Sequence, residues 1–248
     1  MPVSLLRPYG PLNPATPPEP AATYPRRAFI VTLTGGLLLW VAARGLDVKL
    51  SPLTWYLARA SGVTLYLLLW LAAVTGLGLT TKALDRYGGR GQIYSLHVFA
   101  IELGLSFLTL HLLSLAADQT VKYGPAAVFV PFAASWREPW TGFGVIAGYL
   151  GVVVAGSFLL GRFVSYRLWR ALHWLTLPLY ALALAHGVGA GSDAGTPWAM
   201  VLYLVTASIV ALLLATRLLR GPRRAELPVA PLSAPLDRLA RQQHGERD

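Results

Sequence analysis

Residues 93–117 read IYSLHVFAIELGLSFLTLHLLSLAA, an apolar run of 25 residues from Ile93 to Ala117. Glu102 is its only charged residue, and its two histidines, His97 and His111, are fourteen positions apart. A helix needs about 20 apolar residues to cross the hydrocarbon core of a membrane. This stretch is therefore predicted to be a transmembrane helix with both histidines at membrane depth.

Five more segments have the composition of membrane spans. They are Ala28–Ala43, Ala60–Leu79, Trp140–Gly161, Leu168–Gly191 and Pro197–Thr216. The first has only 16 residues, and we expect Arg44 to extend it by reaching the interface. A cleaved signal peptide is the alternative for that segment, but the Pro-rich stretch Pro2–Pro25 is unlike the short basic start of such peptides. The chain is predicted to be all-α, a polytopic six-helix transmembrane bundle.

The composition supports a membrane protein. Of 248 residues, 55% are hydrophobic and only 13% are charged, whereas soluble domains carry about 25% charged residues. The chain has no cysteine, which excludes disulfides, thiolate-bound iron–sulfur clusters, cysteine zinc sites and thioether-linked haem. A metal site in this chain must therefore use histidine or carboxylate ligands.

The basic residues predict the topology. Sixteen of the 21 Lys and Arg residues fall on one predicted side of the membrane, and cytoplasmic loops retain basic residues. Both termini are thus predicted to be cytoplasmic, in a chain expected in a bacterial inner membrane. The net charge of +10 is explained by this topology and by attraction to anionic membrane lipid, so no nucleic-acid partner is expected.

Outside the spans, we expect a disordered Pro-rich tail over residues 1–27 and a basic tail over residues 220–248, which flank a six-helix domain over residues 28–219. Residues 118–139 are expected to form an outer-face loop or short helix, anchored at the interface by Trp136 and Trp140. No glycine-rich dinucleotide fingerprint is present, and the C-terminal tail is too short for a flavin or nicotinamide domain.

Four of the five histidines lie in predicted membrane helices, where ionisable residues are costly and typically functional. Helices 93–117 and 168–191 run in the same direction, so equivalent positions lie at similar depth. This pairs His97 with His173 near the inner face and His111 with His186 near the outer face. The two levels are about 20 Å apart.

Two facing imidazoles are the ligand set of a six-coordinate haem, which serves electron transfer. Zinc and copper sites usually need three or four ligands. His97, Gly104 and His111 share one helix face, so Gly104 is a candidate for close approach of a macrocycle, with helix crossing as the alternative. His186 lies about 140° from His173 on an ideal helix, and we expect a kink or π-type irregularity at Pro178 to bring them into register.

At these residues the sequence resembles the ferric reductase-like transmembrane domain family. This is the haem module of ferric reductases, NADPH oxidases and the membrane subunit of the bacterial methionine-sulfoxide reductase system. The resemblance covers about residues 55 to 216. The stretches that carry it are RASGVTLYLLLWLAAVTG (59–76), GQIYSLHVFAIELGLSFLTLH (91–111) and LWRALHWLTLPLYALALAHGVGAGSD (168–193).

The resemblance implies two b-type haems, with His97/His173 and His111/His186 as axial ligands, that carry electrons across the membrane as an oxidoreductase component. Ferric reductases and NADPH oxidases also carry a flavin and nicotinamide domain, and no such domain is evident here. This departure from the family predicts a stand-alone membrane subunit whose donor is a separate flavoprotein reductase, a free flavin or a quinol. The acceptor stays open between iron, as in a ferric reductase, oxygen, and an extracytoplasmic enzyme such as a methionine-sulfoxide reductase.

Several other residues are candidates for supporting roles. Arg59 is expected to bind a haem propionate, because topology does not require an arginine at that position. Arg90, Arg162, Arg167 and Arg170 are candidates for propionates or a donor phosphate, with inside positive charge as the alternative. Glu102 either tunes the inner haem, carries a proton or pairs with a neighbouring helix. Tyr180 either bridges the haems or packs in the core.

Two further function classes remain open at the level of sequence. A small transporter would use the histidines as a proton relay, although no ladder of acidic residues or inverted repeat is evident. An assembly subunit would need no histidines at matched depth.

Overall fold

The computed structural model describes residues 52–85, 89–118, 125–159 and 163–219, and every regular element in them is a helix. Five segments are long and apolar enough to cross a membrane: Leu53–Thr81, Arg90–Ala117, Glu138–Phe158, Tyr166–Ala190 and Pro197–Leu219. The all-α prediction is confirmed for this part of the chain, and these five segments have the length and composition expected of an integral membrane protein. The predicted first span, Ala28–Ala43, and the two tails lie outside the described residues.

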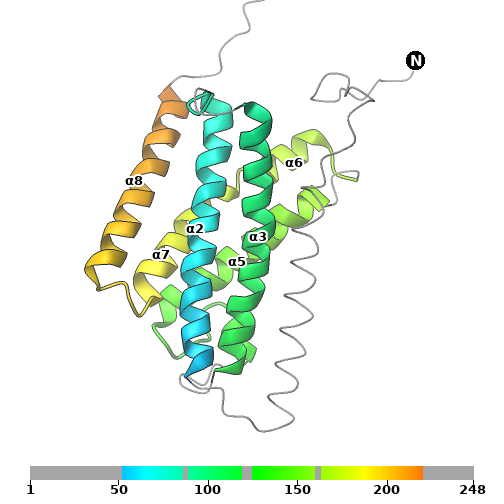
Figure 1. The fold of residues 1–248 in the computed structure, drawn as a ribbon. Coiled ribbons are helices and arrows are strands. Elements are labelled where there is room, and N and C mark those ends of the chain that lie inside the picture. Colours follow the sequence, from blue (N-terminus) through cyan, green and yellow to red (C-terminus); the bar gives the residue numbers. More distant parts are fainter. Residues whose placement is uncertain (1–51, 86–88, 119–124, 160–162, 220–248) are drawn as a thin grey trace, which may run out of the picture.

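Helices α2 (Leu53–Thr81) and α3 (Arg90–Ala117) form an antiparallel pair that packs along its length (Figure 1). Lys82, in the left-handed conformation with φ of 58°, ends α2. At the other end, Thr54 Oγ1 donates to the carboxylate of Asp118 over 3.0 Å. Asp118 is only 2% exposed, so this buried bond fixes the register of the pair.

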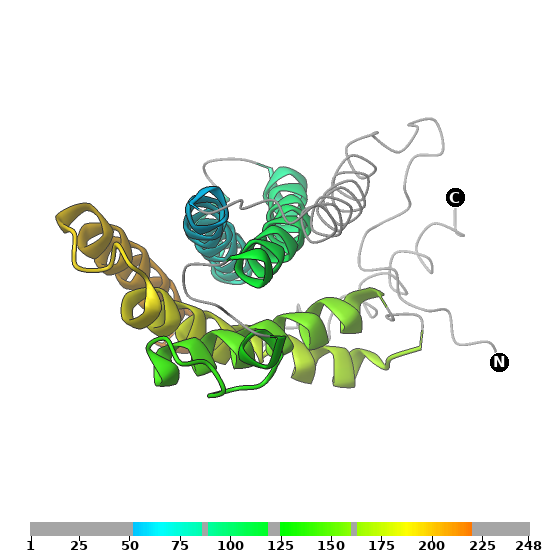
Figure 2. The same ribbon diagram turned by 90° about the horizontal axis from the view of Figure 1, so that it is seen from below.

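A second layer contains α5 (Glu138–Leu159), α6 (Tyr166–His173) and α7 (Thr176–Ala190). Seen from below, this layer lies across from the α2–α3 pair (Figure 2). The short helix α4 (Pro125–Phe129) lies in the connection before α5, as expected for that loop. Among the described helices, α3 packs mainly against α2 and touches the short α4 only at a few residues, whereas α7 packs mainly against α5.

The predicted fifth span is divided into α6 and α7, and its irregularity lies at Trp174 and Leu175 rather than at Pro178. Backbone bonds there close over three residues, as in the 3.2 Å bond from Trp174 N to Ala171 O and the 3.0 Å bond from Leu175 N to Leu172 O. The sequence predicts a kink or π-type irregularity at Pro178. The observed irregularity is not of the π type and consists of three-residue turns that lie three and four residues before the proline. Proline has no N–H and clashes with the carbonyl four residues earlier, which places the break at Trp174.

The last helix, α8 (Pro197–Leu219), packs against α2. A buried cluster of Tyr66, Leu77, Tyr180 and Val210 joins α2, α7 and α8. Tyr66 Oη lies 3.2 Å from Tyr180 Oη and 2.6 Å from Thr206 Oγ1. These bonds satisfy hydroxyl groups that hydrocarbon would otherwise leave unpaired. Tyr180 thus occupies the packing position that was one of its two expected roles.

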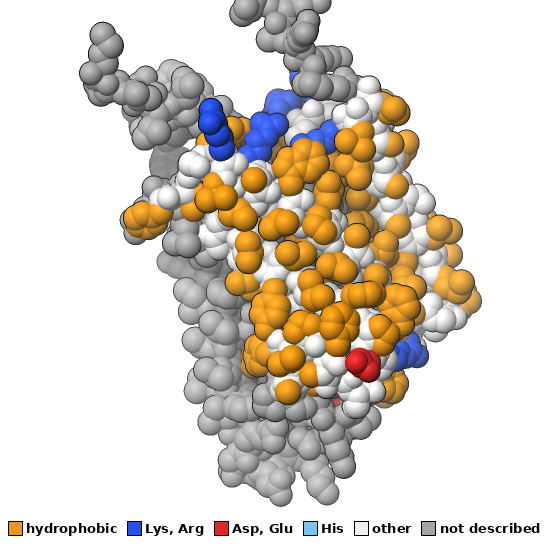
Figure 3. Space-filling view, turned by 180° about the vertical axis from the view of Figure 1, so that it is seen from behind, with side chains coloured by type: hydrophobic (Ala, Val, Ile, Leu, Met, Phe, Trp, Pro, Cys, Tyr) orange, Lys and Arg blue, Asp and Glu red, His pale blue; other side chains and the backbone are white. Residues whose placement is uncertain are grey.

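Basic side chains gather at one end of the bundle, which we call the basic end (Figure 3). It is formed by the C-terminal ends of α2 and α8, the start of α3 and helix α6. Its described basic residues are Lys82, Arg90, Arg167, Arg170 and Arg217. At the opposite end, Arg137 donates to the carbonyls of Gly189 and Gly191 over 3.0 and 3.1 Å, a favourable place for a cation at a helix C-terminus.

Candidate metal centre

The structure brings the four predicted histidines together as two pairs. The rings of His97 and His173 have centroids 6.4 Å apart, and those of His111 and His186 are also 6.4 Å apart. One member of each pair comes from α3, and the other comes from α6 or α7. The pairing predicted from depth is therefore present, and the two pairs bridge the two layers of the bundle.

Three of these rings are held by backbone carbonyls. The Nδ1 atom of His97 lies 2.9 Å from Ala72 O, and the Nδ1 atom of His111 lies 2.8 Å from Ala58 O. Nδ1 of His186 lies 2.9 Å from Trp140 O. A carbonyl only accepts, so each Nδ1 must donate its proton. The Nε2 lone pair is then free to bind a metal, which is the arrangement usual for metal-binding histidines.

A glycine follows each of those carbonyls by four residues and gives the ring its space. A Cβ added to Gly62 would lie 3.0 Å from His111 Cε1, and one added to Gly76 would lie 3.1 Å from His97 Cε1. At Gly144 the same atom would lie only 2.5 Å from His186 Nδ1. Because a helix places residues four apart on one face, the missing side chain opens a path to the carbonyl.

The two contacts between α2 and α3 are copies of one local arrangement. Ala58 and Gly62 are related to Ala72 and Gly76 by a shift of fourteen residues, which is also the spacing of His97 and His111. The sequences ARASG (58–62) and AAVTG (72–76) share Ala, then Ser or Thr, then Gly at the same positions. Sequence reasoning missed these residues, although this repeat carried the signal.

The surroundings of His173 differ from those of the other three. Its ring stacks on the indole of Trp169, with centroids 5.3 Å apart and planes 19° apart. Trp169 precedes His173 by one turn of α6, so the two side chains share a helix face. Trp169 was also missed from sequence, because an aromatic residue at the end of a membrane helix is typical of interfacial anchoring.

The geometry of the two pairs fits an iron porphyrin. A metal lies about 2 Å from an imidazole nitrogen, which is itself about 1 Å from its ring centre, so two axial imidazoles have centres about 6 Å apart. No group of three or more His, Asp or Glu residues occurs in the described part of the chain. Two neutral nitrogens per level match the axial set of a haem better than they match a complete zinc site.

Gly104 lies between the two levels, but it faces α2. A Cβ added there would lie 3.8 Å from Leu68 Cβ and 3.9 Å from Leu65 Cδ1, both ordinary contacts. This position matches helix crossing, the alternative expected for this glycine. Its predicted approach to a macrocycle gains no support from these contacts.

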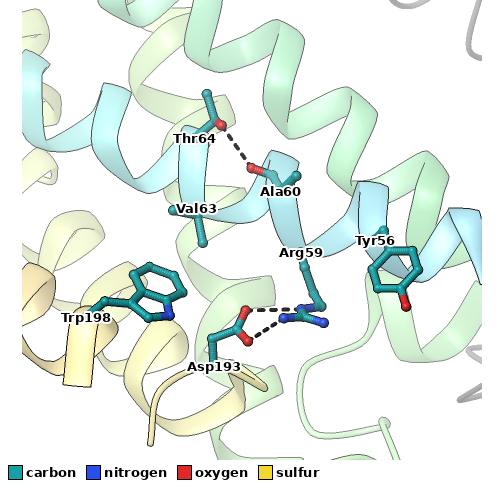
Figure 4. Close-up of a pocket in the computed structure, with 7 residues that line it drawn as sticks. All are labelled: Tyr56, Arg59, Ala60, Val63, Thr64, Asp193 and Trp198. Carbon is teal, nitrogen blue, oxygen red and sulfur yellow. Dashed lines mark hydrogen bonds and ion pairs between the residues drawn. The ribbon is translucent and has the colours of Figure 1, made fainter. Parts of the chain in front are cut away.

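Arg59 is paired with Asp193, a residue that sequence analysis did not single out (Figure 4). The guanidinium donates to both carboxylate oxygens, with 3.1 Å between Nε and Oδ2. The pair lines a cavity of about 490 Å³ together with Trp198 and four other residues of α2, among them Tyr56. Arg59 thus joins α2 to the α7–α8 connection, and its predicted bond to a propionate stays a prediction.

The other basic candidates lie at the basic end. Arg90 contacts Asp85 at 3.5 Å and the carbonyl of Leu79 at 3.2 Å. Arg170 donates to the hydroxyl of Tyr166 over 3.3 Å, and Arg167 is exposed. Arg162 lies outside the described residues. The structure therefore gives Arg90 an acidic partner and leaves Arg167 and Arg170 at the surface of α6.

The fold and the site define an all-α membrane protein with two stacked pairs of facing histidines. Comparisons of this chain with protein-family models, with curated proteins and with solved structures found no match.

Proposed function

We propose that this protein is a membrane subunit of an oxidoreductase that carries electrons between the two faces of the membrane on two b-type haems. The observation that carries the proposal is the pair of histidine contacts, each with ring centroids 6.4 Å apart and separated by fourteen residues of α3. At about 1.5 Å per residue this spacing places the levels about 20 Å apart, which suits a relay across the membrane.

The proposed ligands are His97 and His173 at the basic end and His111 and His186 at the opposite end. Haem iron supplies the redox chemistry by accepting and releasing one electron at a time. The protein holds the ligand nitrogens in place. Carbonyls of Ala72, Ala58 and Trp140 orient three rings through Nδ1, and this second layer of bonds also raises the basicity of the ligand.

The donor proposed for this subunit is a separate flavoprotein reductase, a free flavin or a quinol, and the acceptor lies on the extracytoplasmic face of a bacterial inner membrane. An extracytoplasmic reductase, such as a methionine-sulfoxide reductase, would be such an acceptor. Outward electron movement runs with an inside-negative potential, worth about 2.3 kcal/mol per 100 mV. A histidine proton relay is less well supported, because the two levels are too far apart for direct proton exchange.

Haem content tests the proposal directly. The purified protein, expressed with added haem precursor, should show a b-type reduced-minus-oxidised spectrum, and a pyridine haemochrome assay should give about two haems per chain. A protein that folds and purifies without haem would rule the proposal out.

The ligand assignment is tested by four single substitutions. His97→Ala or His173→Ala should each remove one haem, and His111→Ala or His186→Ala the other, so the haem content falls by about half. His244→Ala changes the fifth histidine, lies in the C-terminal tail and is the matched control. Retention of both haems in all four variants would contradict the assignment.

A further inference from the structure

Three aromatic rings form a stack along one face of α6. The rings of Tyr166 and Trp169 have centroids 5.8 Å apart with planes at 28°, and those of Trp169 and His173 are 5.3 Å apart at 19°. Spacings of three and four residues put all three side chains on the same helix face. Tyr166 is 67% exposed, so the stack leads from the protein surface to the ring of His173.

The stack continues into the inner histidine pair, since the ring of His173 lies 6.4 Å from that of His97. No comparable stack reaches the outer pair in the described residues, where His186 contacts the carbonyl of Trp140 instead. The two levels therefore differ in how they are connected to the surface. Within the described part of the chain, only the inner level has a chain of ring contacts that ends at an exposed side chain.

Positive charge lies along this stack, with Arg170 at its exposed end and Arg217 beside Trp174, the residue after His173. Arg170 donates to Tyr166 Oη over 3.3 Å, and the guanidinium of Arg217 lies 4.4 Å from the ring centroid of Trp174. Arg167 on α6 is also exposed. Asp85, the described acidic residue of the basic end, contacts Arg90. The α6 surface is therefore basic and aromatic, a composition that is enriched at binding interfaces.

Resting on the proposed function, we propose that the Tyr166–Trp169–His173 stack is the route by which electrons enter the inner site, and that the arginines around it dock a negatively charged electron donor. Opposite charge raises the rate of encounter and orients the donor. Each transfer would move one electron and would neither break nor form a bond: a reduced flavin-type donor would lose the electron, and a haem held by His97 and His173 would accept it. Trp169 also acts as a positioning residue, because its face holds the ring of His173.

Reduced flavin mononucleotide and reduced riboflavin are the two probes for this proposal, since they share a ring system and differ by a phosphate. Haem content is measured first in every variant, so that loss of haem, which bears on the proposed function, is separated from slow electron entry. Haem reduction is then followed by stopped-flow absorbance. The affinity of oxidised flavin mononucleotide for the oxidised protein gives a readout independent of turnover.

For the ring stack, Trp169→Leu should slow haem reduction by both probes about tenfold, whereas Trp169→Phe, which keeps a ring, should stay within about threefold of the parent protein. Tyr166→Leu, at an exposed position, should slow it several-fold with both haems in place. Trp198→Leu, at the opposite end, is the control and should leave the rate unchanged. The proposed route would be wrong if Trp169→Leu and Tyr166→Leu both reduced haem as fast as the unsubstituted protein. It would also be wrong if Trp198→Leu slowed haem reduction as much as they do. If Trp169→Leu loses the inner haem, Tyr166→Leu decides the question.

For the docking surface, the double variant Arg170→Gln, Arg217→Gln should weaken binding of flavin mononucleotide about tenfold and slow reduction by it, with little effect on riboflavin. In this double variant, the rate of haem reduction by flavin mononucleotide should lose most of its dependence on ionic strength. Arg90→Gln is the control, because it removes one charge from the same end, at an arginine that is paired with Asp85. It should have little effect on the binding of flavin mononucleotide or on the rate of haem reduction by either probe. Equal effects on both probes, or an equal effect of Arg90→Gln, would overturn the docking surface.

Discussion

A histidine, a backbone carbonyl and a glycine four residues later form the repeated unit of the candidate site. The unit occurs at Ala58 with Gly62 and again at Ala72 with Gly76, where it receives the histidines of α3. It recurs on α5 at Trp140 with Gly144. A carbonyl within a helix can accept a second bond only if a side chain reaches it, and glycine at this spacing provides the opening.

Gly144→Ala is expected to disturb the outer site, because the new methyl group would lie 2.5 Å from His186 Nδ1 and must displace the ring. Haem content should fall from about two to about one per chain, and the cost of overpacking is about 1 to 3 kcal/mol. Gly148→Ala is the matched control, since a Cβ at that position meets no atom within 4 Å. Haem assay and thermal unfolding check the outcome, and unchanged haem in Gly144→Ala would argue against the unit.

Arg59 has two candidate roles: the ion pair with Asp193, which joins two parts of the fold, and the predicted bond to a haem propionate. Substitutions at Arg59 and Asp193 separate these roles. The side chains are 35% and 24% exposed, so the pair should contribute about 1 kcal/mol or less to stability. Asp193→Asn, Arg59→Gln and the double variant should lower the unfolding midpoint by similar small amounts. A coupling energy near zero in this double-mutant cycle would show that the ion pair does not stabilise the contact between α2 and the α7–α8 connection.

The propionate prediction for Arg59 gives a different result in the same variants. If Arg59 binds a propionate, Arg59→Gln shifts the midpoint potential of the outer haem and Asp193→Asn does so much less. Redox titration of the two variants compares them.

At the scale of elements, the division between α6 and α7 decides where the two histidines of the fifth span point. Thirteen residues on an ideal helix leave His186 about 140° from His173, and each residue in a three-residue turn adds about 20° to the rotation. The break follows from Pro178, which cannot donate to Trp174 O. That carbonyl accepts instead from Leu177 N at 3.2 Å.

Pro178→Ala is therefore expected to restore a regular bond to Trp174 O and to favour one continuous helix. Rotation of one histidine away from its partner should then reduce haem content to about one per chain. Pro197→Ala, at the first residue of α8, is the control, because proline is well tolerated at that position of a helix. Two haems in Pro178→Ala would indicate that packing, rather than proline, maintains the break.

At the scale of the whole molecule, the basic end predicts the orientation in the membrane. The chain lacks cysteine, so one introduced thiol reports its own side without background labelling. Gly91 at the basic end and Gly195 at the opposite end both have open space for a side chain. Basic residues favour the cytoplasmic side.

In intact cells, a membrane-impermeant maleimide should label Gly195→Cys, whereas Gly91→Cys should be labelled only after the membrane is permeabilised. Haem content shows that each variant is folded. The reverse labelling pattern would contradict the predicted topology and would move electron entry to the other face.

The sequence by itself determined the all-α class, the five described helices that are long and apolar enough to cross a membrane, and the positions of the four histidines along them. These follow from hydrophobicity and from the rise of a helix, which are properties of one segment at a time. The pairing of His97 with His173 could be predicted because two helices that run in the same direction share one scale of depth.

Only the tertiary structure decided which groups surround each histidine. The carbonyl of Ala58 lies 53 residues from His111, and Asp193 lies 134 residues from Arg59. Such partners depend on the rotation and crossing of helices, which periodicity within one helix does not specify. The position of the α6–α7 break was likewise set by a proline and the carbonyl four residues before it, a steric conflict between two turns of the folded helix.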